Sequence, residues 1–502
     1  MNSARRDLPS VEALAELPDA ACRDLRGRLS ASGFDDKLVM DAERVAPRQF
    51  DAVRLPLVHA WLARRGGPSS TLAALFSYAA AVPEAEVHTA LGADLTSALC
   101  RSGALEPIVG GALLSRYRLT PLGGLLIFSD PPESGPETVM GPGPTTMLLV
   151  DLIPESPGSV LDVGCGAGTL ALVAAARGAR RAVGVDLSER AVRLSQFNAR
   201  LNHSAAEFRA GDLLEPVRGE RFDRILSQPP YVVLPPGMAS TTYLHGGPLG
   251  EELALRFAAA FPEALTERGL ALLHFDAPSL PGRPVVERLR AALANAPVDV
   301  AVLTSPGPSA DLESAAYGAL EDPGLGDRYR EAVQRYRAHL AISGVEAFTR
   351  VLAVLRPSLH KGGIAVQVPS ALERLVPADL DRFLCGLDLA SVSDEVLLAA
   401  RIRLAPGARL LEEATPGSPA SSDARLRFEE GVAVDQELSP AALALMEAVI
   451  SSGRVTDVID DYARRCGTTP DVVAPGVLTA LREGLARAVY APEHRSQGSS
   501  EV

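Results

Sequence analysis

The stretch that decides the fold is VLDVGCGAGTLALVAAA, residues 160–176. An apolar run typical of a buried strand leads into a turn with glycines at positions 164, 166 and 168, and a helical pattern follows. Such glycines allow a tight turn and let a ligand approach the backbone, with the positive end of the helix behind them. A dinucleotide fingerprint would need glycine where Thr169 stands, and Asp162 would place a carboxylate beside the pyrophosphate. The stretch therefore predicts an α/β fold that binds a cofactor without phosphates.

Two further acids stand at the ends of the next two expected strands. GVDLS ends at Asp186, where a carboxylate can accept both hydroxyls of a ribose, and AGDLL places Asp212 and Leu213 where an adenine would lie. Each acid alone could be a helix cap, but three at successive strand tips favour S-adenosylmethionine, which has a cationic centre. We expect the cofactor, and its product S-adenosylhomocysteine, to be bound by Asp162, Gly164, Cys165, Gly166, Gly168, Asp186, Leu187, Asp212, Leu213 and Ser227.

The bulk composition narrows the class of protein. A chain of 502 residues exceeds the size at which one core stops growing, so we expect several domains. The net charge of −13 disfavours a polyanion as partner. Five scattered cysteines predict a reducing, cytoplasmic location and no metal site. Because the sequence has no long apolar run, we expect the chain neither to be secreted nor to span a membrane.

Changes in pattern along the chain predict its domains. Residues 1–135 read as a helical, winged-helix-like accessory domain, and Arg101, Arg116 and Arg118 mark a proposed wing that is either solvated or in contact with nucleic acid. Alternating strands and helices from residue 147 indicate a parallel sheet, with a long helical insert between its last two strands. We expect domains at 1–135, 136–357 and 358–495, the last a small helical, winged-helix-like module, followed by a disordered tail at 496–502.

The fourth expected strand ends unusually, in SQPPYVV at 227–233. A proline pair there is most simply an edge-strand stop, because proline cannot donate to a sheet ladder. Together, however, LDVGCGAGTLAL, GVDLS, GDLL and SQPPYVV resemble the class I S-adenosylmethionine-dependent methyltransferases of the small-domain group, which is NPPY-type and HemK-like. The resemblance covers residues 136–276 well and the flanking modules hardly at all. It implies a Rossmann-like, seven-stranded methyltransferase sheet flanked by the two accessory modules.

The resemblance also implies roles for the PPY segment. The side chain of Gln228 and the backbone carbonyl of Pro229 would accept hydrogen bonds from a planar NH2 group, Pro230 would stiffen the loop, and Tyr231 would stack on the group. The family usually has Asn, Asp or Ser where Gln228 stands, so Ser227 is an alternative contact. These four residues, 228–231, are the predicted catalytic set.

A second glycine pattern follows in YLHGGPLGEE, residues 243–252. It resembles the loop after NPPY in the glutamine methyltransferases, although a plain glycine turn is the alternative. We expect Tyr231, His245, Gly246 and Gly247 to bind the acceptor substrate, with a structural role as the alternative for His245. Upstream, TVMGPGPTTMLL at 138–149 is expected to close over the cofactor.

The sequence therefore predicts an enzyme that N-methylates a planar amide or amino nitrogen on a protein, a peptide or a small molecule of natural product biosynthesis. Methylation of an RNA or DNA base is the first alternative. O-methylation of a small molecule and a non-catalytic cofactor-binding regulator are further alternatives. The sequence leaves open whether the chain forms homo-oligomers, and whether the outer modules select the substrate or only cover the cleft.

Overall fold

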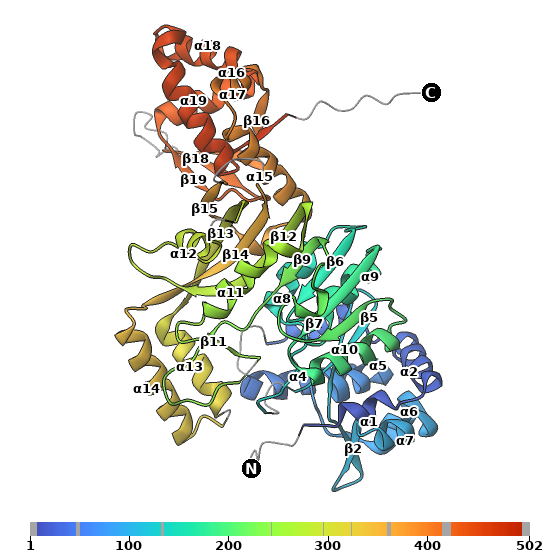
Figure 1. The fold of residues 1–502 in the computed structure, drawn as a ribbon. Coiled ribbons are helices and arrows are strands. Elements are labelled where there is room, and N and C mark those ends of the chain that lie inside the picture. The colour runs from blue at the N-terminus through green and yellow to red at the C-terminus, as the bar shows by residue number, and fades with distance from the viewer. Residues whose placement is uncertain are drawn as a thin grey trace, which may run out of the picture. The chain divides into compact units, whose positions relative to one another are not determined.

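A computed structural model describes the fold over residues 8–46, 51–131, 135–241, 243–294, 296–322, 324–358, 363–413 and 423–493. The chain divides into two compact units, one of residues 1–300 and 307–364 and the other of 301–306 and 365–502 (Figure 1). No helix among the described residues is long and apolar enough to cross a membrane. The tail predicted at 496–502 lies outside the described residues.

The first unit opens with short helices, listed here in chain order. They are α1 (Val11–Ala15), α2 (Asp19–Ser32), α3 (Asp36–Glu43), α4 (Asp51–Arg65), α5 (Gly67–Leu72), a π-helical turn (Ala73–Ser77), α6 (Glu84–Leu91) and α7 (Ala93–Arg101). Three strands, β1 (Val82–Pro83), β2 (Leu105–Ile108) and β3 (Ala112–Ser115), form an antiparallel sheet in the order β1-β3-β2. Short helices followed by an antiparallel strand pair are the order that the sequence predicted for this region. A second hairpin, β4 (Arg118–Leu122) and β5 (Leu125–Ser129), follows.

The predicted methyltransferase sheet follows along the chain, and of its β13 the residues 301–306 belong to the second unit. Its strands are β6 (Ser159–Val163), β7 (Arg181–Asp186), β8 (Glu207–Ala210), β9 (Phe222–Ser227), β12 (Leu265–Pro278), β13 (Val298–Ser309) and β14 (Ala347–Pro357). The full sheet has eight strands, one more than the seven predicted, in the order β15-β13-β14-β12-β9-β6-β7-β8, where β15 is Ala365–Pro369, and β14 runs antiparallel to β12. The strand β6 pairs in parallel with β7 and β9, and β7 pairs in parallel with β8, so the carboxyl ends of these strands meet at one edge. The predicted fold class is confirmed.

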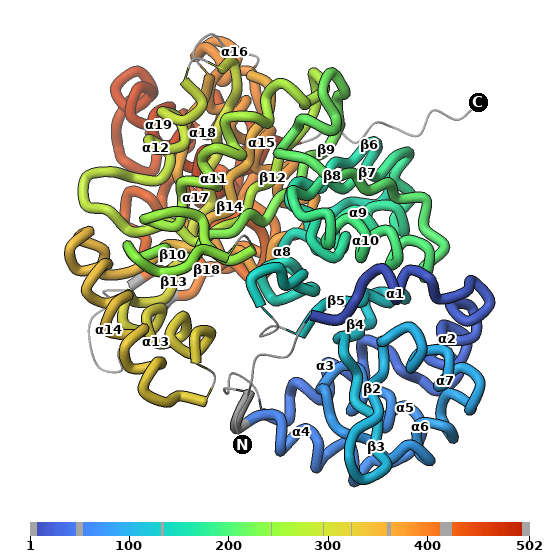
Figure 2. The backbone as a smooth tube through the Cα atoms, turned by 60° about the horizontal axis from the view of Figure 1, so that its bottom comes forward, coloured from blue at the N-terminus to red at the C-terminus, as the bar shows by residue number. Residues whose placement is uncertain are grey.

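Helices connect these strands as the alternating pattern predicted. They are α8 (Pro144–Asp151), α9 (Thr169–Ala176), α10 (Glu189–Leu201), α11 (Glu252–Ala260) and α12 (Val285–Ala292). The predicted helical insert between the last two strands is α13 (Ala310–Glu321) and α14 (Asp327–Ile342). Both views show the insert beside the short strands β10 (Val232–Val233) and β11 (His245–Gly247) (Figures 1 and 2).

Two carboxamides join the hairpin β4–β5 to the sheet domain. Asn198 of α10 is fully buried; its side-chain oxygen accepts from the Phe128 N–H at 2.9 Å, and its nitrogen donates to the carbonyls of Phe128 (2.8 Å) and Ala167 (2.9 Å). Asn202, one turn later, makes the same pair of bonds with Leu126. The side chains of α10 thus complete the open edge of β5, as a neighbouring strand would.

In the second unit, three helices follow a small sheet. The helices α17 (Pro440–Ser452), α18 (Val455–Cys466) and α19 (Pro470–Ala486) agree with the predicted helical segments. The sequence did not predict the antiparallel sheet before them, formed by β17 (Ala408–Glu413), β18 (Asp423–Phe428) and β19 (Gln436–Leu438) in that order. Other elements are β15 (Ala365–Pro369), α15 (Pro377–Ala390), α16 (Asp394–Ala399) and the pair β16 (Ile402–Leu404) and β20 (Tyr490–Pro492).

Candidate active site

The glycine loop lies between β6 and α9, as predicted. Gly164, Gly166 and Gly168 have φ values of +73°, +53° and +84°, a conformation that favours glycine. A Cβ at Gly168 would lie 2.8 Å from the ring of Phe208, so this position also needs glycine for space. The Gly164 N–H donates to the Val185 carbonyl at 2.9 Å, which fixes the loop at the tip of β7.

Two of the predicted acids meet beside this loop. The carboxylate of Asp186 accepts from the Gly166 N–H and the Ser188 N–H, each at 2.9 Å. Asp162, 2% exposed, accepts from the Ala171 N–H at 3.2 Å, and burial, together with repulsion from Asp186, raises its pKa to about 7. Two carboxylates so close would repel a pyrophosphate and stabilise a cation. The residues therefore fit S-adenosylmethionine rather than a dinucleotide.

The remaining predicted cofactor residues differ in their exposure and in their partners. Leu187 is 66% exposed next to Asp186, where a side chain can cover a ring. Asp212 is also accessible, but Arg256 binds its carboxylate at 2.5 Å, a partner that the sequence analysis missed. Leu213 has φ +50°, so the chain turns sharply there.

Two side chains predicted to meet the cofactor instead point into the core. Cys165 is 7% exposed, burial raises the pKa of its thiol well above the usual range, and only its backbone can face a ligand. Ser227 is fully buried, and its hydroxyl donates to the Val163 carbonyl at 2.7 Å. Ser227 therefore links β9 to β6 and has no exposed atom with which to contact a substrate.

The PPY segment lies next to the glycine loop in the sheet. The parallel register aligns Val163, the residue before Gly164, with Ser227, the residue before Gln228. Because both strands end at the same edge, the two loops begin side by side. The sheet thus brings together the glycine loop, which is predicted to bind the cofactor, and the PPY segment, which is predicted to bind the methyl acceptor.

The start of α8 holds the unusual carboxamide of Gln228. The Thr146 hydroxyl donates to Gln228 Oε1 at 2.8 Å, and Gln228 Nε2 donates to the Thr145 hydroxyl at 2.6 Å. Thr146 also accepts from the Gly143 N–H at 3.4 Å, so its proton is available for the amide oxygen. This polarity fixes the orientation of the amide and leaves one lone pair of Oε1 unused.

The second glycine loop packs directly on the PPY backbone. A Cβ at Gly246 would lie 2.0 Å from the Gly250 carbonyl oxygen and 2.5 Å from that of Pro230. A Cβ at Gly250 would lie 2.3 Å from the Tyr231 carbonyl oxygen. These glycines are therefore required for close approach, and Gly247, at φ +129°, is required by its conformation.

The structure gives His245 a structural position instead of a place in an open pocket. The ring is 7% exposed, Nδ1 accepts from the Thr241 N–H at 3.0 Å, and Nε2 lies 3.4 Å from the Tyr336 hydroxyl. Burial lowers the pKa of His245, so the neutral ring donates from Nε2 to Tyr336. The predicted substrate contact is replaced by a link between β11 and α14.

The sequence analysis missed a group of carboxyls around Tyr231. Burial raises the pKa of Tyr231 to about 12, with a further contribution from Asp276 of β12 and a smaller one from Glu313 of α13. Asp276 is 7% exposed, its pKa is raised to about 6 by burial, and Arg350 lies 3.7 Å away. No motif marks these residues, because the insert and the sheet bring them to Tyr231 from distant positions.

The proposed wing does not present three free cations. Arg116 forms an ion pair with Glu106 at 3.0 Å, and Arg118 is only partly exposed on β4. Arg101, at the end of α7, is exposed. One acid of β2, Glu106, thus lies beside the proposed wing.

Comparisons with known proteins agree with this geometry. The family Methyltransferase small domain matches residues 142–236. The chain is 36% identical over 128 residues to a protein N5-glutamine methyltransferase of Methanocaldococcus jannaschii, a match that covers 25% of the chain and 64% of that protein.

Two bacterial relatives show similar identity over parts of their length. A release factor glutamine methyltransferase of Aliivibrio fischeri is 37% identical over 21% of the chain and 39% of that protein. A ribosomal protein L11 methyltransferase of Cupriavidus taiwanensis is 36% identical over 29% of the chain and 54% of that protein. The chain thus spans less than two thirds of each of these relatives. For residues 142–236, the predicted resemblance to the small-domain methyltransferases is confirmed.

Proposed function

We propose that the chain is an S-adenosylmethionine-dependent methyltransferase that methylates a planar amide or amino nitrogen of a protein, a peptide or a small natural product. The observation that carries this proposal is the register of β6 and β9. It sets Gln228 and the two prolines beside the glycine loop. An acceptor nitrogen held at the PPY segment would therefore lie next to the cofactor.

The glycine loop and the strand-tip acids would hold the cofactor. The carboxylate of Asp186 would accept from the ribose hydroxyls, Asp212 and Leu213 would meet the adenine, and the exposed Leu187 would cover a ring beside them. When bound, S-adenosylmethionine supplies a methyl group on a cationic sulfur. A sulfonium beside Asp162 would in turn favour ionisation of this buried carboxyl, whose pKa is raised to about 7.

Gln228 would orient the acceptor. The threonines of α8 fix its amide. The free lone pair of Oε1 and the carbonyl of Pro229 could then each accept a hydrogen bond from an NH2 group. Holding the nitrogen through its hydrogens opposes delocalisation of its lone pair. The partly buried ring of Tyr231 would limit access of water. Most of the rate enhancement would then come from positioning.

A polypeptide acceptor is supported by the relatives and by charge. Their names describe enzymes that act on glutamine of a release factor or on ribosomal protein L11. The net charge of −13 and the ion pair of Arg116 weigh against a nucleic acid. The division into an accessory region at 1–135, a methyltransferase domain at 136–357 and a module at 358–495 is part of the same proposal, and limited proteolysis would test it.

Methyl transfer from tritiated S-adenosylmethionine tests the function. The acceptors would be a release factor, ribosomal protein L11, glutamine-rich peptides, transfer RNA and duplex DNA, offered separately. We expect label in a polypeptide and its loss in Gln228→Ala, whereas Gln334→Ala, an exposed glutamine on α14, should behave as the wild type. Label in nucleic acid alone would contradict the proposed acceptor class.

A further inference from the structure

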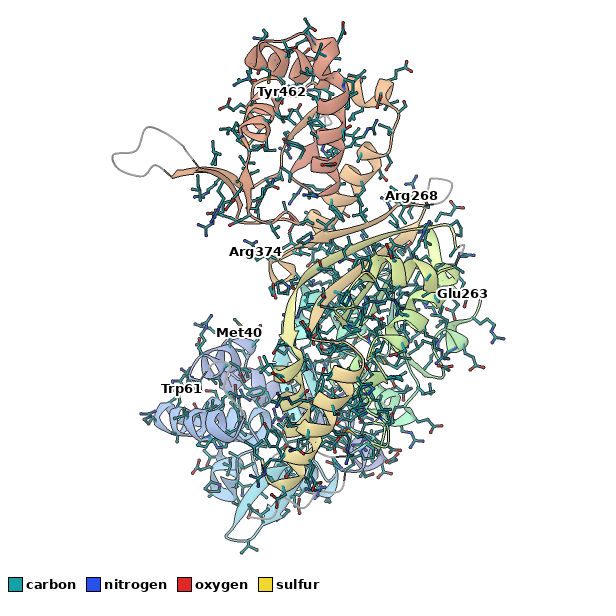
Figure 3. All side chains as sticks on the ribbon, turned by 90° about the vertical axis from the view of Figure 1, so that its left-hand side faces the viewer. Met40, Trp61, Glu263, Arg268, Arg374 and Tyr462 are labelled. Atoms are coloured by element: carbon teal, nitrogen blue, oxygen red, sulfur yellow. The ribbon has the colours of Figure 1, made fainter. Side chains whose placement is uncertain are left out.

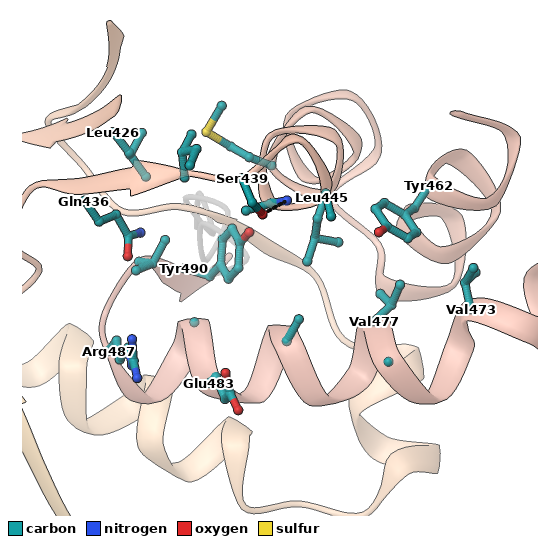
Figure 4. Close-up of a pocket in the computed structure, with 18 of the residues that line it drawn as sticks. Leu426, Gln436, Ser439, Leu445, Tyr462, Val473, Val477, Glu483, Arg487 and Tyr490 are labelled. Carbon is teal, nitrogen blue, oxygen red and sulfur yellow. Dashed lines mark hydrogen bonds between the residues drawn. The ribbon is translucent and has the colours of Figure 1, made fainter. Parts of the chain in front are cut away.

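A groove in the second unit lies between the strand β19 and the helix α19. It encloses about 540 Å³ and is open to solvent (Figure 4). Its floor is apolar, and Figure 4 shows Leu445, Val477 and Tyr490 facing the space between strand and helix. The floor is completed by Leu426, Met446, Tyr462 and Val489.

The strand wall of this groove is a sheet edge. In the sheet order β17-β18-β19, the strand β19 pairs with β18, and among the described residues no strand pairs with its other side. The three residues of β19, 436–438, line the groove together with Ser439, the N-cap of α17. Successive side chains of a strand point to opposite faces, so a groove lined by all three strand residues meets the strand along its backbone edge. Unpaired N–H and C=O groups on such an edge are a template for another extended chain.

The helix wall gives the length of chain that would fit. Lining residues run along α19 from Val472 to Arg487, which at 1.5 Å per residue is about 22 Å. An extended segment of about seven residues, at roughly 3.3 Å each, has this length. Gly476 and Ala480 follow one another at four-residue spacing on this face and leave room for a backbone, whereas at Gly484 the ring of Tyr490 fills the space, 2.3 Å from where a Cβ would stand.

Charged side chains at one end of the groove add a second criterion for the peptide that would bind there. Glu483 and Arg487 both line the groove, and neither forms an ion pair with any residue that the structure describes. Glu437 on the strand side pairs with Arg425 at 3.3 Å. A segment with one basic and one acidic side chain near this end would complement the free pair, while alternate apolar side chains would meet the floor.

We propose that this groove binds an extended peptide segment, which adds to β19 as a further antiparallel or parallel strand. The free strand edge supplies main-chain hydrogen bonds, and the apolar floor selects side chains at every second position. The occupant is a segment of a separate polypeptide. The inference does not depend on the proposed methyl transfer, because it uses only residues of the second unit.

Gly476 provides a sharp test of this proposal. A Cβ added there meets nothing within 4 Å, and glycine is a poor helix residue, so Gly476→Leu should fill the groove without disturbing the fold. Thr479→Leu, which places the same side chain on the exposed side of α19, is the matched control. Val472→Arg is a second variant in the groove; Val472 is 70% exposed, so its replacement leaves the core intact.

The probe is a phage-displayed library of random dodecapeptides, selected on the full chain and then resynthesised with a fluorophore. We expect apolar residues at alternate positions and a dissociation constant in the micromolar range, weakened at least tenfold by Gly476→Leu and by Val472→Arg but not by Thr479→Leu. N-methylation of alternate backbone amides of the peptide should weaken binding equally. Failure to enrich any peptide, equal binding to Gly476→Leu, or a wild-type dimer that Gly476→Leu dissociates would each overturn the proposal. Cofactor titration of the same samples separates this result from the proposed function.

Discussion

Asp162 beside the glycine loop should make the stability of the protein fall as the pH rises. Burial raises the pKa of this carboxyl from 3.8 to about 7, so the folded state takes up a proton that the unfolded state has lost. Between these two values, ionisation favours the unfolded chain. The full shift corresponds to roughly 4 kcal/mol at 1.36 kcal/mol per pKa unit, of which about 2.5 kcal/mol develops between pH 5 and pH 8.

The variant Asp162→Asn removes this ionisation and keeps an oxygen that can accept from Ala171. Relative to the wild type, it should therefore gain about 2.5 kcal/mol of unfolding free energy when the pH is raised from about 5 to about 8. The assay is urea unfolding followed by the fluorescence of Trp61, the single tryptophan, which lies on α4 in the first unit (Figure 3).

Asp223→Asn is the control, because the pKa of Asp223 is lowered in the folded state whereas that of Asp162 is raised. The Ser159 N–H donates to this carboxylate and lowers its pKa, so Asp223 is ionised in both states across the same pH range. Its replacement should change stability by nearly the same amount at both pH values. A wild-type pH dependence that survives in Asp162→Asn would refute the reasoning about the buried carboxyl.

Two further substitutions test the packing around the site. Asn198→Leu leaves the N–H and C=O of Phe128 buried without a partner. At about 1–3 kcal/mol each, this should lower the free energy of unfolding, measured in urea, by about 2–6 kcal/mol. A loss below about 1 kcal/mol would contradict the role of this carboxamide. Gly246→Ala pushes against the Pro230 carbonyl and should reduce the methyl-transfer rate about a hundredfold at unchanged cofactor affinity, since a displacement of about 1 Å is enough for such a loss. Gly27→Ala, with nothing within 4 Å of the new Cβ, should leave the rate unchanged, and equal rates for both alanine variants would exclude the steric argument.

The sequence predicted the sheet because its signals are local. A strand, a turn with three glycines and a helix stand together in residues 160–176, and the acids Asp186 and Asp212 end the following strands, so the order of elements can be read along the chain. The contacts of Gln228 could not be predicted in this way. Its partners Thr145 and Thr146 lie 83 and 82 residues away, and only the folded sheet brings them to the same edge.

The errors have physical reasons as well. His245 and Ser227 carry polar side chains near a motif, which suggested contact with a ligand, but their partners Tyr336 and Val163 are supplied by tertiary packing. The sheet β17–β19 was not predicted, because the region 358–495 was interpreted as a helical module. The strands β17 and β18 stand on either side of residues 414–422, which lie outside the described residues.

Titration calorimetry with S-adenosylmethionine tests the central claim most directly, because every proposed step requires this cofactor at the glycine loop. We expect the wild type to bind one equivalent and Asp186→Ala to bind at least tenfold more weakly, since two charge-assisted hydrogen bonds to the ribose would be lost. Asp223→Asn, remote from the loop, should bind as the wild type does. No heat of binding with the folded wild-type protein, or equal affinity in Asp186→Ala, would contradict the account.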